Sequence, residues 1–161
     1  MKKIRLIALV CLLITVLLPL SACGDKPVQY KTDVSAQAII DNCADELQLN
    51  PVDEDYLTFR MALDTSASDS YAVYVQNSGT TLDEIGVFRA VGDDTAALTE
   101  MIETYLKNRN DEWTGMYLVE EYPKLRDAEY RVIGKYVVYG ILSEEAKAQF
   151  FTAVESYLKA D

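Results

Sequence analysis

The sequence predicts an α+β domain: a small antiparallel sheet of two hairpins with helices packed on it, in the order α-ββ-α(α)-ββ-α. Three observations lead to this prediction. Two pairs of β-rich segments are each joined by a short polar or glycine-containing turn. Apolar residues recur at helical spacing before, between and after these pairs. Residues 34–161 are enough to bury one hydrophobic core without disulfides or metal, so we expect a single domain.

The N-terminus has the pattern of a secretory signal peptide. Three basic residues precede an uncharged run over residues 6–22, and Cys23 follows immediately. The segment Leu20-Ser21-Ala22-Cys23 resembles the lipobox of bacterial lipoproteins. This resemblance implies that the Cys23 thiol receives a diacylglyceryl group and that the signal peptide, residues 1–22, is cut off before it. We therefore expect a lipid-anchored protein on the extracytoplasmic side of the cell membrane.

Two other interpretations of this segment remain open. An uncleaved transmembrane anchor needs about 20 apolar residues, whereas the uncharged run is shorter and contains Pro19. An ordinary signal peptide followed by a chance cysteine would be cut at a similar place without receiving lipid.

The rest of the chain is strongly acidic. The whole sequence has a formal net charge of −11, and removal of residues 1–22, which hold three basic residues and no acid, lowers it to −14. This charge argues against nucleic-acid binding and against adhesion to anionic lipids, because both need basic surface. The absence of histidine excludes Ser-His-Asp and Cys-His catalysis and imidazole metal sites. The polar segment 23–33 is interpreted as the lipidated cysteine and a tether to the domain.

The first predicted helix covers residues 34–47, where apolar residues recur at i, i+3, i+4, i+7 and i+8. Asp33 or Ser35 can serve as its N-cap. Cys43 lies within the apolar stripe, so we interpret it as a small buried thiol rather than as a reactive nucleophile.

Three short segments and a hairpin follow. By composition, residues 50–55 and 64–70 form loops, and residues 56–61 fit either a short helix or an edge strand. The β-rich runs 71–76 and 82–91 flank a five-residue polar loop and predict the first hairpin.

A second helix is predicted after Gly92-Asp93-Asp94. Its apolar spacing continues through Tyr117, and Pro123 indicates a shorter helix with a break there. The second hairpin pairs residues 130–133 with 136–142 across Gly134-Lys135, a Gly-X pair that suits a tight turn. Ser143 then caps the last helix, whose predicted buried face consists of Ala146, Phe150, Ala153, Val154 and Tyr157.

Several short segments together with the lipobox resemble a known family. They are Gly86-Val87-Phe88-Arg89-Ala90 before a helix, Tyr122-Pro123, and Gly134-Lys135-Tyr136-Val137-Val138 before a final helix that contains Phe150. Over about residues 34–158 the chain resembles the DUF4358 family of small bacterial lipoproteins, a domain of unknown function. The resemblance implies a location and a fold, and it brings no activity, cofactor or catalytic residue with it.

Carboxylates are the only abundant reactive groups. Glycoside hydrolysis needs two carboxyls facing each other across a cleft, one with a raised pKa, and adjacent acids in sequence point apart. We interpret the acidic clusters at 53–55, 93–94, 120–121 and 144–145 as solvated faces and helix caps. Asp64 and Asp69 could form a loose cation site, although a solvated loop is the simpler interpretation. The sequence predicts no catalytic residue, metal or cofactor, since it has no P-loop, dinucleotide-binding or CxxC motif.

Eleven tyrosines are the other unusual feature. Most suit a half-buried sheet, but tyrosine is also enriched at interfaces. Tyr71, Tyr74, Tyr136 and Tyr139, which alternate on two predicted strands, are the candidate interaction surface. We therefore expect a non-catalytic lipoprotein module that binds an envelope protein or glycan. The alternatives are a carboxylate-dependent hydrolase acting on wall or glycan substrates and a small solute-capture lipoprotein.

Overall fold

The two predicted hairpins form one antiparallel sheet, because their inner strands pair with each other. The strands are β1 (Asn50–Pro51), β2 (Ser68–Val75), β3 (Glu84–Ala90), β4 (Glu129–Ile133) and β5 (Tyr136–Ile141). Their order in the sheet is β1-β2-β3-β5-β4. The structure is a computed structural model and describes residues 28–160; the predicted signal peptide and Cys23 lie outside these residues.

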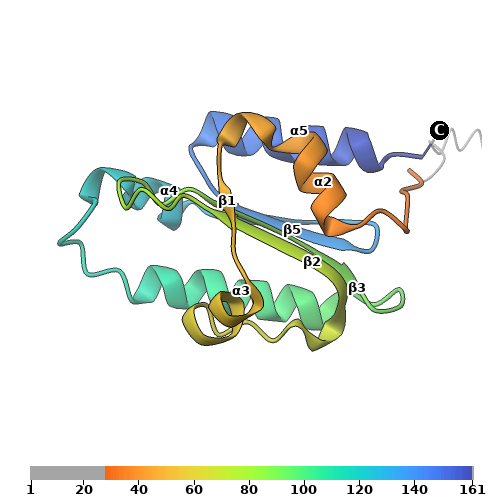
Figure 1. Cartoon of the computed structure of the whole chain (residues 1–161), viewed down its shortest axis with the longest axis horizontal. Helices are drawn as coiled ribbons and strands as arrows, with labels where there is room; N and C mark the ends of the chain where they lie inside the picture. Colours follow the sequence, from red (N-terminus) through yellow and green to blue (C-terminus); the bar gives the residue numbers. More distant parts are fainter. Residues whose placement is uncertain (1–27, 161) are drawn as a thin grey trace, which may run out of the picture.

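Helices cover both faces of this sheet (Figure 1), which confirms the α+β class. Helices α2 (Ala36–Cys43) and α5 (Glu144–Leu158) lie on one face, and α3 (Ala96–Asp111) lies on the other. The short turns η2 (Tyr56–Arg60) and η3 (Thr65–Ala67) lie on the same side as α3. The remaining helical segments are η1 (Asp45–Leu47), η4 (Val119–Glu121) and α4 (Tyr122–Arg126).

The two predicted serine caps are confirmed. The Ser35 side chain accepts a hydrogen bond from the backbone N–H of Ala38, and the Ser143 side chain accepts one from Ala146. Each bond satisfies an otherwise unpaired amide at the start of its helix. Helix α2 is shorter than predicted: it ends at Cys43, and a 3₁₀ turn with Gln48 in the left-handed region (φ 51°) follows.

The inner strands are buried on both faces, because a helix layer lies on each side. Along β5, Tyr136 and Val138 pack toward α2 and α5, whereas Val137 and Tyr139 pack toward α3. All residues of β5 are buried. The alternation of side chains along the strand therefore separates two cores rather than a core and a solvated surface.

Several predicted boundaries are wrong. Residues 50–51, expected in a loop, form the edge strand β1 against β2. The helical spacing through Tyr117 does not continue α3, which ends at Asp111 before a turn that contains Leu118 at φ 52°. Pro123 does not break a helix but lies in the first turn of α4, where its missing N–H needs no partner.

The folded domain begins before residue 34. Gln29 accepts a backbone hydrogen bond from Ala160 (2.8 Å), Lys31 donates one to Leu158 (2.7 Å), and Tyr30 pairs with Lys159 as an isolated bridge. The Tyr30 ring also lies against Gly134 in the β4–β5 turn. Residues 29–31 of the expected tether are thus fixed to the end of α5. Within residues 28–160 no helix is both long and apolar enough to cross a bilayer.

Candidate functional site

The four tyrosines predicted as an interaction surface do not share an exposed face. Tyr136 and Tyr139 are fully buried, and Tyr71 and Tyr74 are half-buried on opposite faces of the sheet. The prediction is wrong because the helices cover both faces of β5. The Tyr136 hydroxyl donates to the backbone oxygen of Val34 (2.9 Å), which fixes the start of the domain.

A polar cluster lies inside the core between the sheet and α3. Glu84, at the start of β3, is 5% exposed, and its Oε1 accepts hydrogen bonds from the hydroxyls of Tyr105 (2.6 Å) and Tyr139 (2.8 Å). The guanidinium of Arg109 lies 3.6 Å from its other oxygen. Helix α3 contributes Tyr105 and Arg109, and β5 contributes Tyr139, so the cluster joins three elements. We call these four residues the Glu84 cluster.

Burial determines the titration of Glu84. Loss of water raises the pKa of this carboxyl, while Arg109 and the two tyrosine hydroxyls oppose the rise without cancelling it. Burial also raises the pKa of Tyr139 well above its usual value. The buried Nε of Arg109 has no hydrogen-bond partner among the described residues. Among residues 28–160, no second carboxylate interacts with Glu84, so these residues do not form the facing pair of acids that glycoside hydrolysis needs around Glu84.

A groove runs along the outer side of α3, next to the Glu84 cluster. Its volume is about 460 Å³, and it lies between α3 and the segment 60–67. Met61 and Leu63 are buried at its base, together with Tyr105. Arg60, Glu100, Met101, Arg109 and Glu112 are among the other lining residues. This α3 groove is therefore apolar at its base and charged along its rim.

The backbone beside the groove is unusual. Residues Tyr56–Arg60 form a single π-helical turn, and Ala62 has φ 53°, in the left-handed region that side chains with a Cβ rarely adopt. Both π turns and such strained residues occur preferentially at functional sites. Phe59, on the same turn, is 79% exposed, which is an uncommon position for a phenylalanine. The segment predicted as either helix or strand is thus irregular, with a π turn and a left-handed residue close together.

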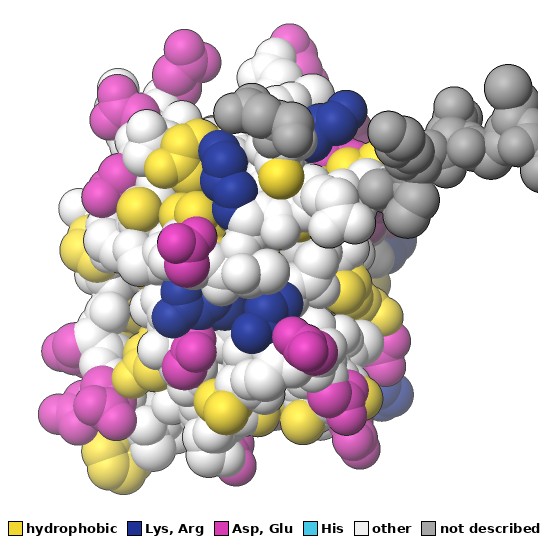
Figure 2. Space-filling view, turned by 90° about the vertical axis from the view of Figure 1, so that its right-hand side faces the viewer, with side chains coloured by type: hydrophobic (Ala, Val, Ile, Leu, Met, Phe, Trp, Pro, Cys, Tyr) yellow, Lys and Arg dark blue, Asp and Glu magenta, His cyan; other side chains and the backbone are white. Residues whose placement is uncertain are grey.

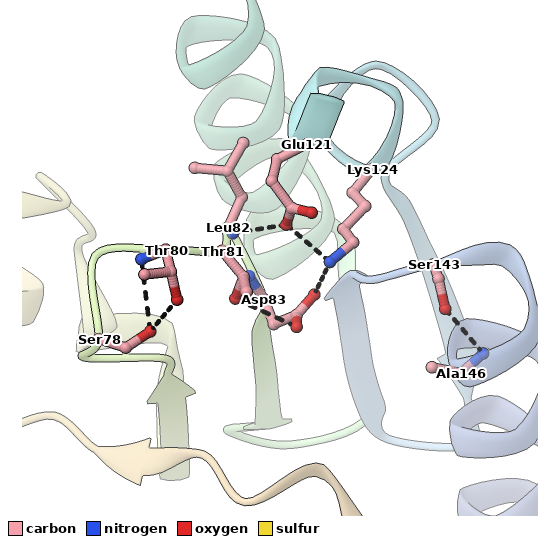
Figure 3. Close-up of polar contacts among 9 residues, drawn as sticks. All are labelled: Ser78, Thr80, Thr81, Leu82, Asp83, Glu121, Lys124, Ser143 and Ala146. Atoms are coloured by element: carbon pink, nitrogen blue, oxygen red, sulfur yellow. Dashed lines mark hydrogen bonds and ion pairs between the residues drawn. The ribbon is translucent and has the colours of Figure 1, made fainter. Parts of the chain in front are cut away.

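A second polar cluster holds the β2–β3 turn against α4 (Figure 3). Lys124 contacts Asp83 (2.8 Å) and Glu121 (2.7 Å), and Glu121 also accepts the backbone N–H of Leu82 (3.1 Å). Burial favours the neutral amine, but the two carboxylates outweigh it and raise the pKa of Lys124. The same ion pair lowers the pKa of Glu121 against the effect of burial. A lysine whose raised pKa keeps it protonated is a poor general base and a weak general acid near neutral pH, so we assign the cluster a structural role.

The other predicted candidates have ordinary structural partners. Asp64 accepts the N–H of Ser66 and caps η3, whereas Asp69 pairs with Arg89 (2.6 Å), so these two carboxylates do not converge. Cys43 is half-buried, and burial raises the pKa of its thiol to about 11. A thiol with such a pKa is a poor nucleophile near neutral pH.

Three buried residues of the last helix, Lys147, Phe151 and Leu158, were not part of its predicted buried face. Lys147 is 2% exposed; its Nζ contacts Glu144 (2.7 Å) and donates to the backbone oxygen of Asp127. Phe150 and Val154 are buried as predicted, while Ala146, Ala153 and Tyr157 are half-buried. The signal for Lys147 is its spacing, three residues before Phe150 on the helix.

Comparison with known proteins identifies the family of this fold. The family model described as "Domain of unknown function (DUF4358)" matches residues 42–142, which include the α3 groove and the Glu84 cluster. Neither the curated proteins nor the solved structures contain a match. A match over more than half of the chain confirms the resemblance seen in the short segments around Gly86 and Gly134. The chain belongs to the DUF4358 family of domains of unknown function.

Proposed function

We propose that this protein is a lipoprotein, anchored by lipid on Cys23 to the extracytoplasmic side of the cell membrane, and that its domain is a non-catalytic binding module. The α3 groove carries the proposal for binding. It combines an apolar base, two arginines and an irregular backbone, and these features together are typical of a binding site.

The rim of the groove indicates what kind of partner it suits. Arg60 is exposed and has no ion-pair partner among the described residues, whereas Arg109 faces both the groove and Glu84. Arginine binds carboxylates with two parallel hydrogen bonds. A partner segment with an apolar side chain for the base and an acidic group for Arg60 fits this arrangement. An envelope protein presents such a segment more readily than a glycan does.

The lipid anchor is tested by Cys23→Ala. Without the thiol no thioether to diacylglycerol can form, and the acidic domain has little attraction of its own for anionic lipid. We expect the variant to leave the membrane fraction in cell fractionation, while the wild-type protein stays in it. Cys43→Ala is the matched control and should remain with the membranes. Retention of Cys23→Ala at the wild-type level would contradict the anchor.

Binding in the groove is tested by photo-crosslinking in intact cells. A photoreactive residue at Glu100, which is exposed on the groove rim, should give a discrete adduct. The same residue at Thr152, exposed on α5 across the sheet, should not. Arg60→Glu should reduce the adduct at position 100 several-fold, because it reverses the charge offered to an acidic partner, and Arg126→Glu should leave it unchanged. Adducts of equal yield at both positions, or no response to Arg60→Glu, would contradict the groove as the binding surface.

A further inference from the structure

The fold places the anchored end of the chain at one end of the sheet. Residues 29–31 are fixed to Leu158 and Ala160, and Tyr30 lies against the β4–β5 turn at Gly134. Ala90, the last residue of β3, donates its N–H to Lys135 of the same turn (2.9 Å). These contacts bring the N-terminal segment, the β4–β5 turn and the end of β3 together. We call this the tether end.

The opposite end holds the β2–β3 turn and the segment after α3. The Tyr117 hydroxyl donates to the backbone oxygen of Gly79, and Glu121 and Lys124 hold Leu82 and Asp83. We call this the distal end. Strand β3 runs from the distal end at Glu84 to the tether end at Ala90, a length of about 20 Å. Three of the most exposed apolar side chains lie at the distal end, namely Met116, Tyr117 and Val119.

The chain between the proposed lipid and the domain is short. Five peptide units separate Cys23 from Val28, and even a fully extended chain of this length spans at most about 18 Å. A folded domain of this size has a diameter of roughly 36 Å. The link is therefore at most half as long as the domain. With so short a link, the domain cannot turn over so that its distal end touches the bilayer and its tether end points away.

The charge of the tether end is compatible with a lipid surface. Figure 2 views this end, where lysine and arginine side chains cross the centre of the face and acidic side chains lie mostly around its rim. Two ion pairs lie here, Arg89 with Asp69 (2.6 Å) and Lys135 with Asp93 (3.6 Å). Lys31 and Lys159 have no acidic partner among the described residues.

From this geometry we infer that the tether end faces the membrane, and that the short link keeps the domain upright with its distal end outward. The inference rests on the proposed lipid at Cys23. The short link determines which end faces the bilayer, and the lysine and arginine side chains of this end reduce its repulsion from anionic headgroups. The exposed apolar side chains of the distal end then point away from the bilayer.

The inference is tested with the lipidated protein purified from membranes and placed in vesicles of zwitterionic and anionic lipid with nitroxide-labelled headgroups. In a Cys43→Ala background a fluorophore is attached at Val91→Cys, at the tether end, or at Met116→Cys, at the distal end. Both positions are exposed and uncharged in the native protein. The headgroup nitroxide should quench the probe at position 91 several-fold more than the probe at position 116.

A longer link supplies the control. A flexible insertion of about 20 residues between Pro27 and Val28 adds a root-mean-square reach of about 25 Å, and it should largely remove the difference between the two probes. Equal quenching with the native link, or stronger quenching at position 116, would overturn the inference while the lipid anchor still stands. A protein that does not associate with the vesicles at all would instead contradict the anchor.

Discussion

Replacement of Glu84 by alanine should lower the free energy of unfolding by about 2–5 kcal/mol, because two buried hydroxyls lose their acceptor and each unsatisfied buried polar group costs roughly 1–3 kcal/mol. The variant leaves the hydroxyls of Tyr105 and Tyr139 without their acceptor and the guanidinium of Arg109 without its carboxyl partner, all on the α3 side of the core. Urea denaturation followed by circular dichroism measures the change. Glu100→Ala, which removes an exposed carboxylate from the same side of the domain, should stay within about 0.5 kcal/mol of the wild type.

Glu84→Gln separates the hydrogen bonds from the charge. Its amide oxygen can still accept from the two tyrosine hydroxyls, so it should destabilise the domain less than Glu84→Ala does. The pKa of Glu84 is raised in the folded state, so the folded protein keeps a proton that the unfolded chain has lost. The stability of the wild type therefore falls as pH rises from the unfolded pKa, about 4.3, toward the folded value.

Glutamine does not titrate, so the stability advantage of the wild type over Glu84→Gln should shrink as pH rises through this window. Denaturation of both proteins between about pH 4 and pH 8 tests this expectation. An advantage that grows with pH would show that Arg109 and the tyrosines outweigh burial and hold Glu84 ionised.

The order of elements could be predicted because it depends on local patterns. The period of apolar residues located the helices, Ser35 and Ser143 indicated two of their starts, and Gly134-Lys135 indicated a hairpin that has Gly134 at φ 59°. These signals act between residues that are close in sequence. They do not determine which strands of different hairpins pair, and the β3–β5 pairing brings the two hairpins into one sheet.

The candidate site could not be predicted because its contacts are long-range. Nothing in the sequence near Glu84 distinguishes it from a solvated acid at the start of a strand; its burial follows from α3 and β5 lying on either side of it. The prediction of a tyrosine surface was wrong for the same reason. Alternation along β5 indicates that the strand has two faces, but it does not indicate what covers each face. The α3 groove depends on the irregular segment 56–63, whose short apolar run suits helix and strand equally.

Gly86 should be among the positions least tolerant of any side chain, although it lies in the middle of a strand. It pairs with Tyr139 across β3 and β5, and a Cβ at this position would lie 2.8 Å from two atoms of the Tyr139 ring and closer still to Cε1. The ring is fully buried and its hydroxyl is bonded to Glu84, so it cannot move aside without breaking that bond. Gly86→Ala should therefore lower the free energy of unfolding by at least about 1–3 kcal/mol, the usual effect of overpacking a core.

Two comparisons make this expectation specific to the contact with Tyr139. Gly140 is a buried glycine on the neighbouring strand β5. A Cβ at this position would approach the Leu142 side chain only to 3.5 Å, which is an ordinary van der Waals contact. Gly140→Ala should therefore have a much smaller effect than Gly86→Ala. In a Tyr139→Ala background, the further change Gly86→Ala should be nearly neutral, because the obstructing ring is gone. If Gly86→Ala destabilises both backgrounds equally, then the strand needs glycine for a reason other than room for Tyr139.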